Sequence, residues 1–158
     1  MSMPALETHE EKVAFVEGAI EQAEALRREK RYEEAISLLV EALQYGLEKA
    51  KLYYRLGNVY FDGGDLGRAE YAYNRALEVD PKYTNAMHNL AVVYKRQKKI
   101  SLYVKTYKKS QRMALRYPAK REFSASEKRR IRFLSLKILL WILGGFGVVA
   151  VLIWWFGR

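Results

Sequence analysis

Side chains suited to catalysis or metal binding are few in this chain and lie far apart. The 158-residue sequence has no cysteine, so it offers no disulfide, no thiolate metal site and no cysteine nucleophile. Its two histidines, His9 and His88, do not have the spacing of a histidine-rich metal site, and no His-Glu-x-x-His motif occurs. We therefore expect no metal and no other cofactor.

Two further groups of residues resemble parts of catalytic sites but have simpler explanations. Gly63, Gly64 and Gly67 lack the full phosphate-binding motif, and they fall in a predicted turn between helices. Glu33 and Glu34 fall at a predicted helix start, where acidic side chains interact favourably with the helix dipole. We therefore expect that the protein is not an enzyme.

The net charge of +10 is unevenly divided along the chain. Residues 1–48 carry eleven acids and five bases, a net of −6, and residues 49–83 carry five acids and six bases, a net of +1. Residues 84–158 carry two acids and seventeen bases, a net of +15. Bases of this density bind nucleic acid in some proteins and anionic lipid headgroups in others. We favour lipid contact, because these bases lead up to a strongly apolar segment.

A run of twenty uncharged residues, 138–157, lies close to the C-terminus. Twelve of the twenty are Leu, Ile, Val or Phe, and Trp141, Trp154 and Trp155 lie near its two ends. At about 1.5 Å of rise per residue, a helix of this length spans about 30 Å, the thickness of the hydrocarbon core of a bilayer. The run predicts a transmembrane helix with its tryptophans at the lipid headgroups.

The charges on either side of this run predict its orientation. Only Arg158 follows the run, whereas five bases crowd the preceding flank, so the positive-inside rule places the amino-terminal part in the cytosol and the C-terminus across the membrane. The chain is thus predicted to be a tail-anchored single-pass protein with a basic juxtamembrane segment at 118–137. The bases expected at the membrane surface are Lys128, Arg129, Arg130, Arg132 and Lys137.

Three glycines within the apolar run, Gly144, Gly145 and Gly147, would let another helix pack closely. The strict GxxxG spacing is absent. We favour a plain anchor and keep packing against integral membrane subunits as the alternative.

The segment before the apolar run contains a repeat of 34 residues. Two sets of four positions within residues 50–83 have a characteristic spacing: Tyr53, Leu56, Gly57 and Tyr60, then Ala69, Tyr73, Ala76 and Pro81. This segment resembles the tetratricopeptide repeat (TPR), with Tyr53 in place of the usual tryptophan. A shift of 34 residues in either direction predicts further repeats at 16–49 and 84–117, and the last one departs at Tyr103, where a small alanine is expected.

The resemblance implies an all-α fold of three stacked helix-turn-helix repeats, a short right-handed solenoid followed by the single transmembrane helix. Local signals place helix ends: a capping box at Thr8 and Glu11, an N-cap at Asp65 and a turn at Pro81. The repeat domain is predicted to occupy 9–117, after an amino-terminal extension at 1–8. The expected helices lie near 9–29, 32–45, 49–62, 66–79, 83–97 and 100–116.

Proteins of this family usually bind a peptide or an extended segment in a concave groove lined by the first helix of each repeat. On that resemblance, Tyr54 and Phe61 would offer flat apolar contacts, and Asn58 and Asn85 would hydrogen-bond a peptide backbone. The groove residues that the resemblance implies are Glu17, Ile20, Glu24, Arg27, Lys51, Tyr54, Asn58, Phe61, Asn85, His88, Val92 and Lys95.

The favoured function is therefore a membrane-anchored TPR scaffold or adaptor that recruits a protein partner on the cytosolic face, where anchoring raises the effective concentration of the groove. The alternative is a structural or assembly subunit of a multi-subunit membrane complex. A minor alternative is a chaperone-recruiting co-chaperone: Asn58 and Asn89 fit the asparagine positions of the family's carboxylate clamp, but Tyr54 replaces its lysine. Near-ideal repeat residues and the lack of an organelle signal favour a bacterial inner membrane over a eukaryotic organelle membrane.

Overall fold

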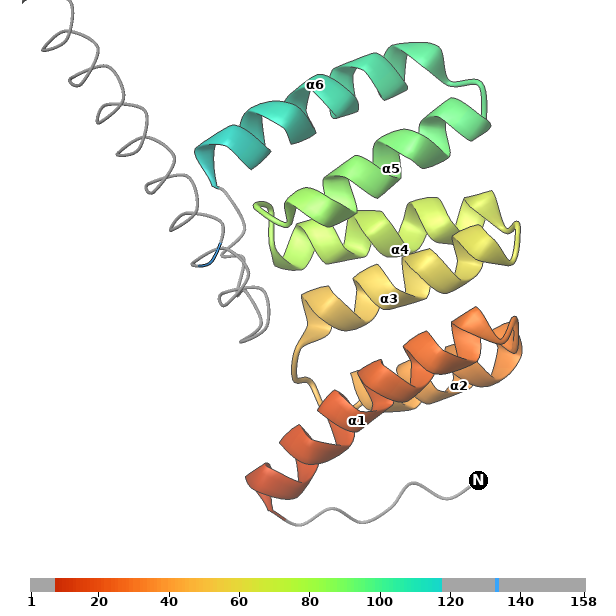
Figure 1. Ribbon diagram of the computed structural model, residues 1–158, viewed down its shortest axis with the longest axis vertical. Helices are drawn as coiled ribbons and strands as arrows, with labels where there is room; N and C mark the ends of the chain where they lie inside the picture. The colour runs from red at the N-terminus through yellow and green to blue at the C-terminus, as the bar shows by residue number, and fades with distance from the viewer. Residues whose placement is uncertain (1–7, 118–132, 134–158) are drawn as a thin grey trace, which may run out of the picture. The chain divides into compact units, whose positions relative to one another are not determined.

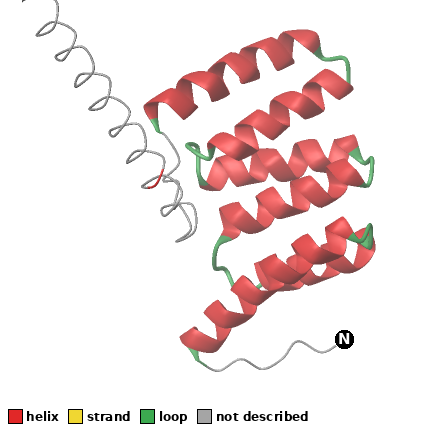
Figure 2. Ribbon diagram, viewed as in Figure 1, coloured by secondary structure: helices red, strands yellow, loops and turns green. Residues whose placement is uncertain are grey.

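The computed structural model describes residues 8–117 and 133. This part of the chain contains six helices joined by short turns, and successive helices run antiparallel and stack in chain order (Figure 1, Figure 2). All six belong to one compact unit, Met1–Pro118. The helices are α1 (His9–Arg28), α2 (Tyr32–Leu43), α3 (Lys49–Asp62), α4 (Leu66–Val79), α5 (Thr84–Arg96) and α6 (Ile100–Arg116).

The predicted all-α repeat fold is confirmed, and each helix end lies within two residues of its expected position. At the start of α1, the Glu11 backbone N–H donates to Thr8 Oγ1 at 3.2 Å, and the Thr8 N–H donates to Glu11 Oε2 at 3.1 Å. At the start of α4, Asp65 accepts from the Arg68 backbone N–H at 2.8 Å. These bonds satisfy donors that the first turn of a helix leaves without a partner, which explains why the helices begin there.

None of the helices in the described part of the chain is both long enough and apolar enough to cross a membrane. The transmembrane helix predicted at 138–157, with its three glycines, lies outside the described residues. The bases predicted at the membrane surface, from Lys128 to Lys137, lie outside them too.

The middle repeat is organised around a close contact between α3 and α4. A Cβ placed on Gly57 would lie only 2.5 Å from Tyr73 Cε1, so the glycine makes room for the tyrosine ring. Tyr73 is 1% exposed, and Ala69 of the same apolar cluster is fully buried. Small residues thus let these two helices approach closely while a tyrosine fills the gap between them. The packing also fixes where the Tyr73 hydroxyl lies, within hydrogen-bond distance of Asn58.

The third repeat departs from the other two at its second helix. Ala35 and Ala69, at equivalent positions in the first two repeats, are buried, whereas Tyr103 is half-buried. Ser110 is the single buried residue of α6, while α5 buries six. Because no described helix packs against the other side of α6, most of its surface is exposed (Figure 1).

Candidate functional site

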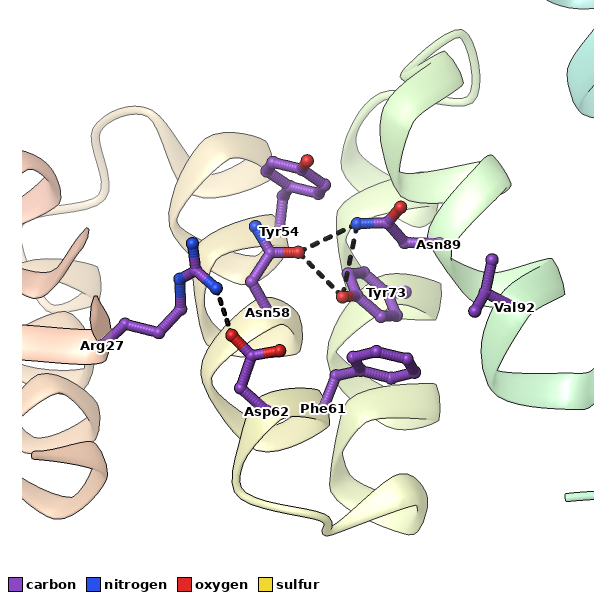
Figure 3. A pocket seen from close by; sticks show the side chains of 8 residues that line it. All are labelled: Arg27, Tyr54, Asn58, Phe61, Asp62, Tyr73, Asn89 and Val92. Carbon is purple, nitrogen blue, oxygen red and sulfur yellow. Dashed lines mark hydrogen bonds and ion pairs between the residues drawn. The ribbon is translucent and has the colours of Figure 1, made fainter. Parts of the chain in front are cut away.

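A pocket of about 300 Å³ is lined by residues from four helices, and we call it the central pocket (Figure 3). Helix α3 supplies four of its lining residues, α5 supplies two, and α1 and α4 supply one each. The lining residues are Arg27, Tyr54, Asn58, Phe61, Asp62, Tyr73, Asn89 and Val92.

A hydrogen-bond network joins three of these residues across three helices. The Tyr73 hydroxyl donates to Asn58 Oδ1 at 2.8 Å, and Asn89 Nδ2 donates to the same oxygen at 2.9 Å. Asn89 Nδ2 also lies 3.5 Å from the Tyr73 hydroxyl. Burial raises the pKa of Tyr73 well above its ordinary value, although the hydrogen bond with Asn89 acts in the opposite direction. The hydroxyl therefore stays protonated at neutral pH and continues to donate to Asn58.

The network also fixes which way the two amide groups point. Asn58 uses its oxygen twice, which leaves its nitrogen to donate elsewhere, and Asn89 uses its nitrogen, which leaves its oxygen to accept. Neither of these two remaining atoms has a hydrogen-bond partner among the residues that the structure describes, and Figure 3 shows both pointing away from the network. The central pocket therefore presents one unused amide donor and one unused acceptor.

Charged groups on the α1 side of the central pocket neutralise one another. The Arg27 guanidinium pairs with the Asp62 carboxylate and binds both oxygens of Glu24, at 2.7 Å and 3.0 Å. The hydrogen bond from Arg27 holds the pKa of Glu24 below its usual value, against the opposing effect of burial. Arg55 approaches Glu24 as well, at 3.2 Å. Both charged residues that line the pocket are thus paired, and the surface offered to a ligand is polar but close to neutral.

An apolar wall completes the central pocket. The Tyr54 ring lies 6.1 Å from the Tyr73 ring and 5.0 Å from the Tyr83 ring, centroid to centroid, so it is held in place by aromatic contacts. The Arg96 guanidinium lies 4.2 Å from the centroid of the Phe61 ring. Val92 adds an aliphatic surface from α5. These side chains can take up an apolar group of a ligand without large rearrangement.

The structure brings five of the twelve predicted groove residues to the central pocket. They are Arg27, Tyr54, Asn58, Phe61 and Val92. Glu24 contributes indirectly, because it holds Arg27, and Glu17 is exposed elsewhere on α1.

Four other predicted residues lie outside the central pocket. Asn85 and His88 line a separate cavity of about 160 Å³ between α5 and α6. Lys51 lines a third cavity, near the start of α3. Lys95 points toward α6, with its Nζ 5.8 Å from the centroid of the Tyr103 ring.

The prediction that Ile20 lines the groove is wrong. Its side chain is 3% exposed and belongs to the apolar cluster that includes Val16 and Leu39. Its repeat equivalent, Tyr54, is half-buried and long enough to reach the pocket, whereas the shorter isoleucine side chain is covered by the core. Ile20 is therefore unavailable to a partner.

Three residues that line the central pocket were not among the predicted groove residues. For two of them, the sequence spacing indicates a position on the groove face. Asp62 follows Asn58 by four residues, and Asn89 precedes Val92 by three, so helical spacing places each on the face of a predicted residue. Tyr73 has no such signal, because its core position in the repeat does not indicate how far its hydroxyl reaches. Within residues 8–117 and 133, no three acidic or histidine side chains are grouped as metal ligands would be.

Comparison with known proteins gives three further findings. Residues 57–98 match the family model described as TPR repeat. A stretch of 49 residues is 41% identical to the uncharacterized protein ycf37 of Pyropia yezoensis, and it covers 31% of this chain and 28% of that protein. Two solved structures of MamA superpose on this chain with TM-scores of 0.60 and 0.59, at 24% and 18% identity. These superpositions cover 64% and 66% of this chain and 59% of each MamA chain.

The chain thus spans less than a third of its curated relative and less than two thirds of the MamA chains. At these identities, the MamA structures show the fold alone. Together, the repeat spacing, the family match and the superpositions support tetratricopeptide repeats as the architecture of the described helices. Repeats of this type suggest a protein-interaction scaffold as the class of function.

Proposed function

We propose that this protein is a scaffold that binds an extended peptide segment of a partner protein in the central pocket. The proposal rests on the unused donor of Asn58 and the unused acceptor of Asn89, which point away from the network on its two sides (Figure 3). Each peptide unit of an extended chain offers one N–H and one C=O, which are the complementary groups. Side chains of the partner on either side of this peptide unit would lie against Tyr54 at one end and against Phe61 and Val92 at the other (Figure 3).

The size of the central pocket supports a short contact within a longer ligand. A volume of about 300 Å³ is at the small end of the range for small-molecule sites. It accommodates one bulky side chain with its neighbouring peptide groups, and the rest of the segment would extend over the exposed surface of α1 and α3.

A terminal carboxylate, the ligand of the co-chaperone alternative, fits this pocket less well. Recognition of a carboxylate needs an available cation. Arg27 is the cation among the eight lining residues, and its guanidinium already pairs with Asp62 and Glu24. We therefore favour an internal, uncharged stretch of a partner over a chain end.

We also propose that the scaffold is anchored in a membrane. This proposal is supported by the uncharged run at 138–157 and by the bases that precede it, which under the positive-inside rule favour a scaffold on the cytosolic side. Membranes carrying the full chain are to be washed in alkaline carbonate. We expect the protein to stay with the membranes, and its release would contradict the anchor.

A pair of asparagines on one helix gives a matched test of peptide binding. Asn89→Ala removes the unused acceptor of the central pocket, while Asn85→Ala changes the same residue type one turn away, at a separate cavity. Partners are to be captured with the full chain from the cells that make it and quantified by mass spectrometry. We expect Asn89→Ala to weaken capture of the partner about tenfold, since one such contact is worth roughly 1–1.5 kcal/mol, and Asn85→Ala to leave it unchanged.

The same experiment separates the scaffold from the accessory-subunit alternative. Integral membrane proteins recovered in fixed stoichiometry, resistant to salt and unaffected by Asn89→Ala, would favour a subunit of a membrane complex. Equal loss of partners in both variants would contradict the central pocket as the binding site. Circular dichroism of each variant is to confirm that its helices are intact.

A further inference from the structure

The outer face of α6 combines two strips of side chains that the central pocket does not use. Helix α6 is the last helix of the described stack, and no described helix covers this face (Figure 1). The two strips, which we call the apolar strip and the basic strip, lie next to each other along the helix.

The apolar strip consists of Ile100, Val104 and Leu115. These side chains are 57%, 41% and 86% exposed. Their spacings of four and eleven residues place them on one side of the helix, because 3.6 residues complete a turn. Most exposed large apolar side chains of the described stack lie on α6 or just after it, so they gather at one end of the domain.

The basic strip consists of Lys105, Lys108, Lys109, Arg112 and Arg116. None of these five forms a salt bridge with another described residue. From Thr84 to Tyr117 the sequence holds nine bases and no acid, so no carboxylate from α5 or α6 offsets their charge. Glu78 of α4 lines a cavity with Lys105 and Lys109, but it is paired with Arg75, so the strip is a strongly positive surface directly beside exposed apolar groups.

We propose that the outer face of α6 binds the surface of an anionic lipid membrane. An apolar strip flanked by lysine and arginine is the pattern of helices that lie in the plane of the lipid interface. Ile100, Val104 and Leu115 would enter the boundary between headgroups and acyl chains, and the basic strip would contact anionic headgroups. This role goes beyond the binding of a partner in the central pocket.

Other occupants fit this face less well. The chain's own segment at 118–137 carries seven bases and two acids, so it would be repelled by the basic strip. A second copy offers acidic charge at α1, but the exposed outer residues there include Gly18, Glu21 and Gln22, which give little apolar surface for the apolar strip. A lipid surface supplies both the negative charge and the apolar boundary.

The length of the chain permits this contact together with the predicted anchor. Twenty residues, 118–137, separate the described stack from the uncharged run at 138–157. A chain of this length spans at most about 70 Å. Both parts can therefore engage one bilayer.

The absence of native cysteine allows a direct test on the full-length protein. Leu115→Cys creates one site for an environment-sensitive fluorophore on the apolar strip, and Val40→Cys, at a 44% exposed position on α2, serves as the control. Each labelled chain is to be reconstituted in vesicles of phosphatidylcholine alone or with phosphatidylserine. We expect the label at position 115 to shift to the blue, and to be quenched by nitroxide lipids, several-fold more in the anionic vesicles. The label at position 40 is expected to stay unchanged.

Charge reversal isolates the contribution of the basic strip. Lys108→Glu with Arg112→Glu should abolish the response at position 115, whereas reversal of Lys30 and Lys49, which are exposed and far from α6 in sequence, should preserve it. No response in anionic vesicles, or an equal response in neutral ones, overturns the proposal. A shift that rises with protein concentration without lipid also overturns it and assigns the face to a second copy. Asn89→Ala should leave the response intact, which separates this test from that of the central pocket.

Discussion

Replacing Gly57 by alanine tests the contact that holds the central pocket together. The added Cβ would lie 2.5 Å from Cε1 and 2.6 Å from Cδ1 of Tyr73, far inside normal contact distance. Tyr73 has little room to move, because it is 1% exposed and its hydroxyl is bonded to Asn58. Either the ring or the packing of α3 against α4 must therefore shift.

The size of the effect follows from three contributions. Forcing an extra methyl group into a packed core costs about 1–3 kcal/mol. Displacing the Tyr73 ring weakens its hydrogen bond to Asn58, at a further cost of up to about 1 kcal/mol. The better helix propensity of alanine offsets about 1 kcal/mol. We expect Gly57→Ala to lower the free energy of unfolding by up to about 3 kcal/mol, and to lower Tm by about 4–8 °C for each kcal/mol lost.

Gly18→Ala is the matched control, because it makes the same change inside another helix. A Cβ at Gly18 would meet no atom within 4 Å, so only the propensity gain remains. We expect this variant to be more stable than the wild type by about 0.5–1 kcal/mol. Urea unfolding followed by far-ultraviolet circular dichroism compares the two. A Gly57→Ala protein as stable as the Gly18→Ala protein would mean that Tyr73 is not displaced by a Cβ at position 57.

Three further predictions concern the caps and the titrating groups. Asp65→Ala removes the side-chain cap of α4 and should cost about 1 kcal/mol in urea unfolding, and an unchanged midpoint would contradict the role of the cap. Burial raises the pKa of Tyr83 from 10.0 to about 12, so the folded state holds this proton more tightly and stability should fall as pH rises between these values. Tyr83→Phe should reduce that alkaline loss, measured as the free energy of unfolding against pH. The hydrogen bond from Arg27 lowers the pKa of Glu24 below 4.5, so the stability from this pair is present above that pH and lost as pH falls further. Glu24→Gln should lower stability at neutral pH and flatten its acid dependence, and an acid profile identical to that of the wild type would contradict this.

The helices could be predicted because their determinants are local and repeated. The bonds of Thr8 and Asp65 reach only three residues along the chain, and Pro81 ends a helix by its own geometry. The 34-residue spacing then sets which small residue meets which tyrosine, as Gly57 meets Tyr73. Caps, helix-ending prolines and repeat spacing can all be recognised from the sequence alone.

The site could be predicted only in part, because its geometry depends on how far individual side chains reach. The Tyr73 hydroxyl enters from α4, although the repeat pattern assigns that residue to the core. Arg27 was expected in the groove, but its pairing with Asp62 depends on the packing of α1 beside α3. Asn85 shares a helix and a residue type with Asn89 yet lies at another cavity. To assign groove residues by their position in the repeat is to assume that equivalent side chains have equal length. Ile20 does not meet this assumption, because it is shorter than its equivalent Tyr54 and is buried.

Site-specific photocrosslinking shows directly whether the central pocket binds a peptide segment of a partner protein. A photoreactive amino acid is to replace Val92, within the pocket, or Val40, exposed on α2, in the full chain in the cells that make it. Mass spectrometry of the crosslinked peptides then identifies the segment bound. We expect one uncharged internal segment of a partner to be captured from position 92, about tenfold less with Asn89→Ala, and not from position 40. The same proteins captured from both positions, or none from position 92, would contradict this expectation.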